Sequence, residues 1–137
     1  MNMTVTNIDR GSLVVEDDGI VGYVDDTLTV GATTTLAAGT ILARDSATGK
    51  LIAFVKGGVT NGNGVVKGIL TYAVANATGG AVDVAVRVPN EVTVIKSRMV
   101  IAADGNSSNV DAVVRDALKG VGVYVVDATD QNIADNQ

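Results

Sequence analysis

The chain contains no cysteine, no histidine and no tryptophan, and its aromatic residues are few. Without cysteine it forms no disulfide bond and no thiolate metal site. Without histidine it lacks the side chain that most often serves as a general base or a metal ligand near neutral pH. We therefore expect a protein that is not an enzyme, with no catalytic residue, no metal site and no cofactor.

Long apolar runs and basic clusters are also missing. No apolar run approaches the ~18 residues of a membrane span, and Met1–Thr4 lack the basic and apolar regions of a signal peptide. The net charge is −5, and the densest basic cluster is Lys96-Ser97-Arg98. Because nucleic-acid binding needs clustered basic side chains, we expect neither nucleic acid nor membrane as a partner. The sequence predicts synthesis in the cytoplasm of the producing cell.

Small apolar residues and glycine dominate what is present. The 137 residues suit one domain, and the 47% hydrophobic content comes mostly from valine, alanine, isoleucine and leucine. With 16 glycines, this composition favours short strands joined by glycine turns. Charged residues reach only 18%, against the roughly 25% of an average domain. That deficit fits either a surface partly covered by partners or an ordinary soluble domain rich in small residues.

The centre of the chain, residues 39–70, carries the clearest pattern. Residues 40–44 and 51–55 are two apolar runs separated by a six-residue turn. In this turn Asp45 and Ser46 can bond back to the backbone and Gly49 can adopt a positive φ, which predicts a β-hairpin. A third strand at residues 65–70 follows the glycine-rich loop 57–64, and Gly68 inside it indicates a bulge or a close backbone approach.

Further strands are expected on both sides of this centre. Residues 13–15 and 20–23 flank an Asp-Gly hairpin signal, and residues 27–30 form another short strand. Residues 81–88 alternate strictly, with Val82, Val84, Val86 and Val88 on one face. Pro89-Asn90 is predicted to turn the chain, so that residues 91–95 return antiparallel.

One helix is expected, over residues 108–119. Residues 106–108 supply N-cap candidates, Asp111 and Arg115 can pair on the solvent side, and Gly120 provides a left-handed stop. The predicted buried face consists of Val110, Val113, Val114, Ala117 and Leu118. A last strand follows at residues 121–126, and residues 127–137 form a polar extension. The fold class is therefore α+β with β predominating: a small antiparallel β-rich domain of hairpins or a partly open barrel, with one helix in its C-terminal half.

Three features of the sequence are candidates for a chemical site. The pairs Asp17-Asp18 and Asp25-Asp26 lack the spacing of a calcium loop, so turns or solvated edges are the interpretation. The loop at residues 61–64 lacks the Lys-Ser/Thr of a phosphate-binding loop and a following helix, which favours a flexible hairpin loop. Lys50 at a hairpin tip lacks the flanking residues of a lipoyl or biotinyl carrier lysine.

The order of the central motifs resembles a known family. Ala38-Gly39-Thr40-Ile41-Leu42, Thr48-Gly49-Lys50-Leu51 and Val66-Lys67-Gly68-Ile69-Leu70 together resemble the head decoration (capsid cement) proteins of tailed bacteriophages, of the lambda type. The opening at residues 7–14 and the helix-and-strand ending also look similar to that family. The resemblance spans residues 7 to about 126.

The resemblance implies a structural virion protein. Such proteins bind the outer surface of the mature head as homotrimers at local three-fold positions, contact the major capsid protein and stabilise the capsid. The family's N-terminal arm reaches the capsid, which here implies an extended capsid-binding arm within residues 1–8, comprising Met3, Thr4, Val5, Thr6, Asn7 and Ile8. Two alternatives remain open: another virion module, such as a head fibre base or a tail-tube or baseplate domain, and a carbohydrate-binding β module.

Overall fold

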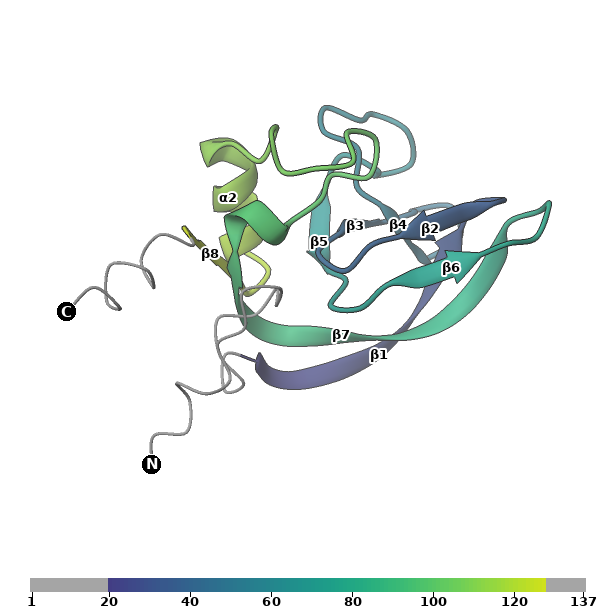
Figure 1. Cartoon of the computed structure of the whole chain (residues 1–137), viewed down its shortest axis with the longest axis horizontal. Helices are drawn as coiled ribbons and strands as arrows, with labels where there is room; N and C mark the ends of the chain where they lie inside the picture. The colour runs from purple at the N-terminus through teal and green to yellow at the C-terminus, as the bar shows by residue number, and fades with distance from the viewer. Residues whose placement is uncertain (1–19, 128–137) are drawn as a thin grey trace.

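A long two-stranded ribbon runs through the computed structural model, which describes residues 20–127 (Figure 1). Its strands are β1 (Ile20–Val30) and β7 (Val82–Ile95), paired antiparallel from Ile20 opposite Val92 to Val30 opposite Val82. The other elements are β2 (Thr34–Leu36), β3 (Ile41–Arg44), β4 (Leu51–Ala53), β5 (Val66–Ile69), β6 (Val74–Asn76), the 3-10 turn η2 (Lys96–Arg98), α2 (Ala112–Lys119) and β8 (Val123–Val126).

Six of these strands form one curled sheet in the order β5-β3-β4-β1-β7-β8. Most pairs are antiparallel, but β1 pairs with β4 in parallel, and so does β7 with β8. The remaining two strands, β2 and β6, form a small antiparallel sheet of their own. The expected β-predominant α+β class is confirmed, as a nearly closed, barrel-like sheet with one helix.

Gly68 explains how the two sides of the curled sheet approach each other. It lies in β5, and a Cβ atom built on it would stand 3.0 Å from Cγ1 of Val88 in β7. The register between β3 and β5 also shifts between Leu42 and Ala43. Both expectations for Gly68, a bulge and a close approach, are therefore met, because a bulge bends a strand toward its neighbour.

The central hairpin forms as predicted. Strands β3 and β4 pair antiparallel, with Leu42 opposite Ala53. In the turn between them, Oδ1 of Asp45 accepts a hydrogen bond from the backbone N–H of Ala47, and Gly49 has a φ of 77°. The turn therefore follows from its sequence, since only glycine adopts that conformation without strain.

The core lies on both faces of this sheet. Ile41 and Ala43 of β3 pack in a cluster with α2, whereas Leu42 between them packs with β1 and the small sheet, because successive side chains of a strand alternate. The first cluster is Ile41, Ala43, Phe54, Val66, Ile69, Val92, Val94, Met99, Ile101, Val110, Val114, Leu118 and Val123. The second is Leu28, Val30, Leu36, Leu42, Leu51, Leu70, Val74 and Val86.

The predicted turn at Pro89-Asn90 is wrong, because β7 continues through both residues as one strand of 14 residues. The backbone N–H of Arg87 points away from β1 and donates to the hydroxyl of Tyr72. Because backbone N–H groups along a strand alternate in direction, the nitrogen of Pro89, two residues on, also points away from β1. Pairing with β8 begins only at Val92. A proline there removes no ladder hydrogen bond, which is where a strand tolerates proline.

The two short strands predicted at residues 20–23 and 27–30 are one strand, β1. Gly22 bends it without ending it, with a φ of 71°. Asp25 and Asp26 therefore lie within a strand and not in a turn, because the ladder with β7 continues through both.

The helix is shorter than predicted, beginning at Ala112 after the N-cap residue Asp111. Its buried residues are Val114 and Leu118, and Val110 is buried just before the N-cap, whereas Val113 and Ala117 are exposed. Gly120 is right-handed, with a φ of −65°, and the left-handed glycine is Gly122, with a φ of 89°. A Cβ atom on Gly122 would meet the carbonyl oxygen of Asn90, so this glycine allows β8 to approach β7.

Candidate interaction surfaces

Part of the predicted site lies outside the described residues. The capsid-binding arm, with Met3, Thr4, Val5, Thr6, Asn7 and Ile8, belongs to this part. So do the Asp17-Asp18 pair, the first strand of the predicted N-terminal hairpin and all but the first residue of the C-terminal extension. These predictions remain predictions.

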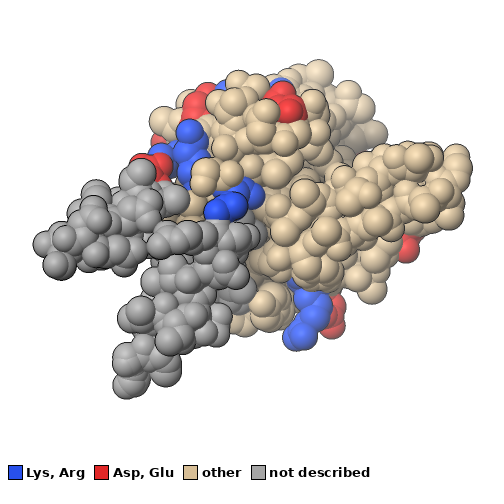
Figure 2. Space-filling view, in the orientation of Figure 1, with Lys and Arg blue, Asp and Glu red and all other residues tan. Residues whose placement is uncertain are grey.

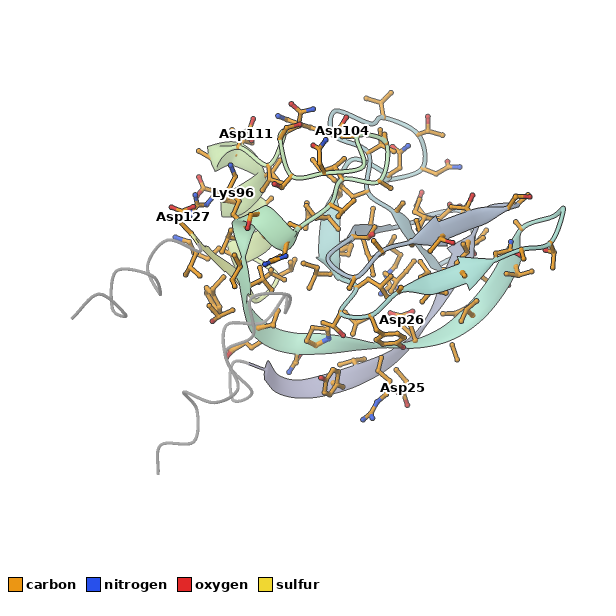
Figure 3. The ribbon with its side chains drawn as sticks, viewed as in Figure 1. Asp25, Asp26, Lys96, Asp104, Asp111 and Asp127 are labelled. Carbon is orange, nitrogen blue, oxygen red and sulfur yellow. The ribbon has the colours of Figure 1, made fainter. Side chains whose placement is uncertain are left out.

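The two carboxylates of the Asp25-Asp26 pair have different surroundings, as expected for neighbours in a strand (Figure 3). Asp26 forms a two-point ion pair with Arg44 of β3, with Nη2 2.7 Å from Oδ2 and Nη1 3.2 Å from Oδ1. The side chain of Asp25 is 91% exposed, and its Oδ1 lies 3.7 Å from Nε of Arg87. The pair therefore does not present two carboxylates to one cation.

Asp26 also makes stability depend on pH. The hydrogen bonds from Arg44, together with one from the backbone N–H of Thr27, hold the pKa of the Asp26 carboxyl below its usual value. The folded state thus favours the ionised carboxylate more than the unfolded state does. This adds stability in full above the unfolded-state pKa of about 3.9, and the added stability is lost as the pH falls through the lower folded-state pKa.

We expect Asp26→Asn to lower the free energy of unfolding by about 0.5–1 kcal/mol at pH 7, as is usual for a partly exposed pair. The difference from the unmodified chain should vanish in strong acid, when Asp26 is protonated in both states. Chemical denaturation at pH 7 and at steps down into strong acid measures this. Asp25→Asn serves as the control, and an equal loss for both variants at pH 7 would contradict the assignment.

The glycine-rich loop, residues 57–64, is tied by backbone hydrogen bonds to the segments beside it. Val55 donates its N–H to the carbonyl of Asn63 at 2.8 Å, and Asn61 accepts from Ser46 at 2.9 Å. A Cβ atom on Gly64 would lie 2.1 Å from the carbonyl oxygen of Gly58. This framework holds Val59 outward with 95% of its surface exposed. The loop therefore presents an apolar side chain among uncharged residues.

Two lysines that flank this region are held in ion pairs. Nζ of Lys50 lies 2.5 Å from Oδ2 of Asp83 in β7, so the hairpin tip is tied to the ribbon. Nζ of Lys56 lies 2.6 Å from Oδ2 of Asp111, the residue that caps α2. Hydrogen bonds from these lysines lower the pKa values of Asp83 and Asp111. Lys50 thus has a structural partner.

Two shallow hollows of about 280 and 270 Å³ flank α2. Arg115 and Asp116 line both hollows. Arg115 does not form the predicted solvent pair with Asp111, because its Nη2 donates to the carbonyl of Val125 in β8 at 3.0 Å. Asp111 in turn accepts from the N–H of Val114. The polar groups here hold the helix to the sheet, and among the described residues no three histidine, cysteine or acidic side chains gather as metal ligands.

Charge is distributed very unevenly over the molecule. Residues 27–43 and 68–82 contain no lysine, arginine, aspartate or glutamate. The fold brings parts of both runs together in β2, β6 and their turns, which we call the uncharged lobe and define as residues 31–37 and 73–81. In Figure 2 it forms the tan projection on the right, while blue and red side chains gather mainly elsewhere. Sequence reasoning noted the low charge of the chain but did not find this lobe.

No protein-family model matches the chain, and no curated protein sequence matches it. Among residues 20–127 there is also no helix long and apolar enough to cross a membrane.

Proposed function

We propose that the protein is a capsid decoration protein of a tailed bacteriophage, which binds the outer surface of the mature head as homotrimers and stabilises it. Its partners are then the major capsid protein and its own copies. The proposal rests on one observation above all: the three motifs that resemble this family lie together in the sheet, the first entering β3, the second closing the β3–β4 turn and the third forming β5, the neighbour of β3.

The junction of the first and third motifs illustrates this support. Gly39 donates its N–H to the carbonyl of Leu70 at 2.6 Å, and Leu70 donates to the carbonyl of Thr40 at 2.9 Å. Gly39 has a φ of 95°, a conformation that favours glycine. The residues that carry the resemblance are thus the ones that build the sheet, which supports the proposal because the motifs have structural roles in this fold.

A decoration protein needs several separate contacts rather than an active site, because bridging neighbouring capsid subunits multiplies modest affinities. The described surface offers one uncharged region for such a contact, the loop that holds out Val59. The proposed arm at residues 1–8 would add a second contact, as a strand at an exposed sheet edge of the capsid.

Deletion of residues 1–7 tests the arm. We expect the truncated chain to keep the melting temperature of the full chain, because the described core contains none of the deleted residues, and to lose most of its binding to expanded heads of the phage that encodes it. Head occupancy is measured by cosedimentation and by electron microscopy. Equal decoration by both chains would exclude the arm as the anchor, and no decoration by the full chain would overturn the proposed function itself.

The alternative roles make different predictions. A tail-tube or baseplate module forms six-fold rings, which images of virions with and without the protein would distinguish from three-fold decoration. A carbohydrate-binding module needs an open aromatic platform. Among residues 20–127 Phe54 is buried, whereas Tyr23, Tyr72 and Tyr124 are exposed. Two of these tyrosines are engaged by Arg87, whose guanidinium carbon lies 5.0 Å from the centre of the Tyr23 ring and whose backbone N–H donates to the Tyr72 hydroxyl. No observation favours either alternative over decoration.

A further inference from the structure

We infer that the uncharged lobe is the surface through which copies of this chain bind one another. The occupant is a second copy, whose surface covers the outer face of β2 and β6. The inference names the self-contact of the proposed homotrimer and rests on the proposed function in that respect. The observations that lead to it, however, are features of the lobe itself.

The outer face of the lobe lacks the features that keep a sheet solvated. Leu36 and Val74 face the core, whereas Thr35 and its cross-strand partner Ala75 face outward and are exposed. Around them the exposed residues are small or uncharged, namely Ala32, Thr33, Ala37, Ala73, Ala77, Thr78, Gly79, Gly80 and Ala81. Depletion of charge distinguishes the centre of a protein interface from the rest of a protein surface.

The edges of the lobe are short, three residues in each strand, but they carry no side chain that would block pairing. Within the described part of the chain, β2 and β6 pair only with each other. Free strand edges in soluble proteins usually carry lysine, proline or an inward charge that prevents another chain from pairing with them. Neither strand carries any of these. Such an edge is expected where a partner covers it in the working assembly.

The lobe is held to the rest of the fold by hydrogen bonds, and a surface that is already positioned loses less entropy on binding. The buried side chain of Asn76 fixes it to β1. Nδ2 of Asn76 lies 3.1 Å from the carbonyl oxygen of Val30 and 2.9 Å from that of Gly31, while Oδ1 accepts from Thr78 at 2.9 Å. A two-stranded sheet alone is marginally stable in water. The hydrogen bonds of Asn76 therefore fix the position of β2 and β6 relative to β1.

Backbone strain lies at the tip of the same lobe. Thr33 is exposed and has a φ of 51°, a left-handed conformation that is a real outlier for a β-branched residue. Its N–H donates to the carbonyl of Thr78 at 2.9 Å, which closes the tip. Strain of this kind persists where the surrounding structure enforces it, and it concentrates at binding surfaces.

The distribution of charge favours an identical copy as the occupant. Residues 20–127 contain nine basic and nine acidic side chains, so the net charge of −5 comes entirely from residues 1–19 and 128–137. The described chain begins and ends at the opposite end of the molecule from the lobe (Figure 1). Copies that meet at the lobe therefore bring neutral surfaces together, while the attachment points of their like-charged terminal segments lie away from the contact. Contact at the lobe thus avoids the like-charge repulsion that copies of a chain with a net charge of −5 would meet elsewhere.

Sedimentation velocity over a concentration series tests the inference, with the full chain and the variant Ala75→Glu. We expect the unmodified chain to form oligomers, and we expect Ala75→Glu to raise the dissociation constant at least about tenfold, since the new carboxylate would be buried without a partner. Ala117→Glu, the same change at an exposed position of α2, should leave association unchanged. Melting curves of all three chains check that each is folded.

A monomer at every concentration for the unmodified chain would overturn the inference, and so would equal association of the Ala75→Glu and Ala117→Glu variants. The proposed function fails separately. A chain that decorates heads but stays monomeric in solution refutes the lobe contact alone. A chain that associates through the lobe but never binds heads refutes decoration alone.

Discussion

Replacement of Gly39 by alanine should cost more stability than the same change at any other glycine that the structure describes. The Cβ atom would stand 2.1 Å from the carbonyl oxygen of Arg98, a backbone atom that cannot rotate away. The left-handed conformation of Gly39 adds about 1–2 kcal/mol for any residue with a Cβ atom, and overpacking adds about 1–3 kcal/mol. We expect the Gly39→Ala chain to be largely unfolded or to melt far below the unmodified chain by circular dichroism.

Gly49 provides a matched control for this effect. It has a φ of 77°, but a Cβ atom built on it would meet no atom within 4 Å. The Gly49→Ala variant should therefore show only the conformational part of the loss, about 1–2 kcal/mol. If both variants lose the same stability in urea denaturation, the close approach of Gly39 to Arg98 has no energetic weight.

Replacement of Leu118 by alanine should have the second large effect, a loss of about 2–5 kcal/mol in the free energy of unfolding. The Leu118 side chain is fully buried in the cluster that joins α2 to the sheet, so its removal leaves a cavity. The midpoint of denaturant unfolding should fall while the slope of the transition stays the same.

Val113 on the same helix is the control for Leu118, because 75% of its surface is exposed. We expect Val113→Ala to change stability by less than about 0.5 kcal/mol, as for most surface substitutions. Arg115 does not serve for this purpose, since its guanidinium binds the carbonyl of Val125. A loss at Val113 comparable to that at Leu118 would mean that the exposed face of α2 is covered by something else.

Local patterns in the sequence were sufficient for much of this fold. The β3–β4 hairpin, the bulge at Gly68 and the alternation of Val82 to Val88 each follow from neighbouring residues. The existence of α2 also follows, because Val110, Val114 and Leu118 repeat at helical spacing. Its first residue does not follow, since Asp111 is drawn into the N-cap and paired with Lys56, which lies 55 positions away.

The features that could not be predicted from the sequence depend on contacts between residues that are far apart in the chain. Pro89 stops most strands, and whether β7 continues through it depends on where Tyr72 and β8 lie. The uncharged lobe is another example, because residues 34–36 pair with residues 74–76 and neither run has a strong strand pattern. Low charge alone could not locate a contact surface until the fold had brought the two uncharged runs together.

The ribbon of β1 and β7 has a consequence for how the chain folds. Along the sequence, its paired residues are separated by 52 positions at one end, Val30 with Val82, and by 72 positions at the other, Ile20 with Val92. Closing such long loops loses conformational entropy before stabilising contacts have formed, so topologies of this kind fold slowly. The β3–β4 hairpin encloses only six residues and can form early. Until the ribbon closes, the uncharged lobe has no Asn76 anchor on β1, and copies synthesised at high concentration are then most exposed to mispairing.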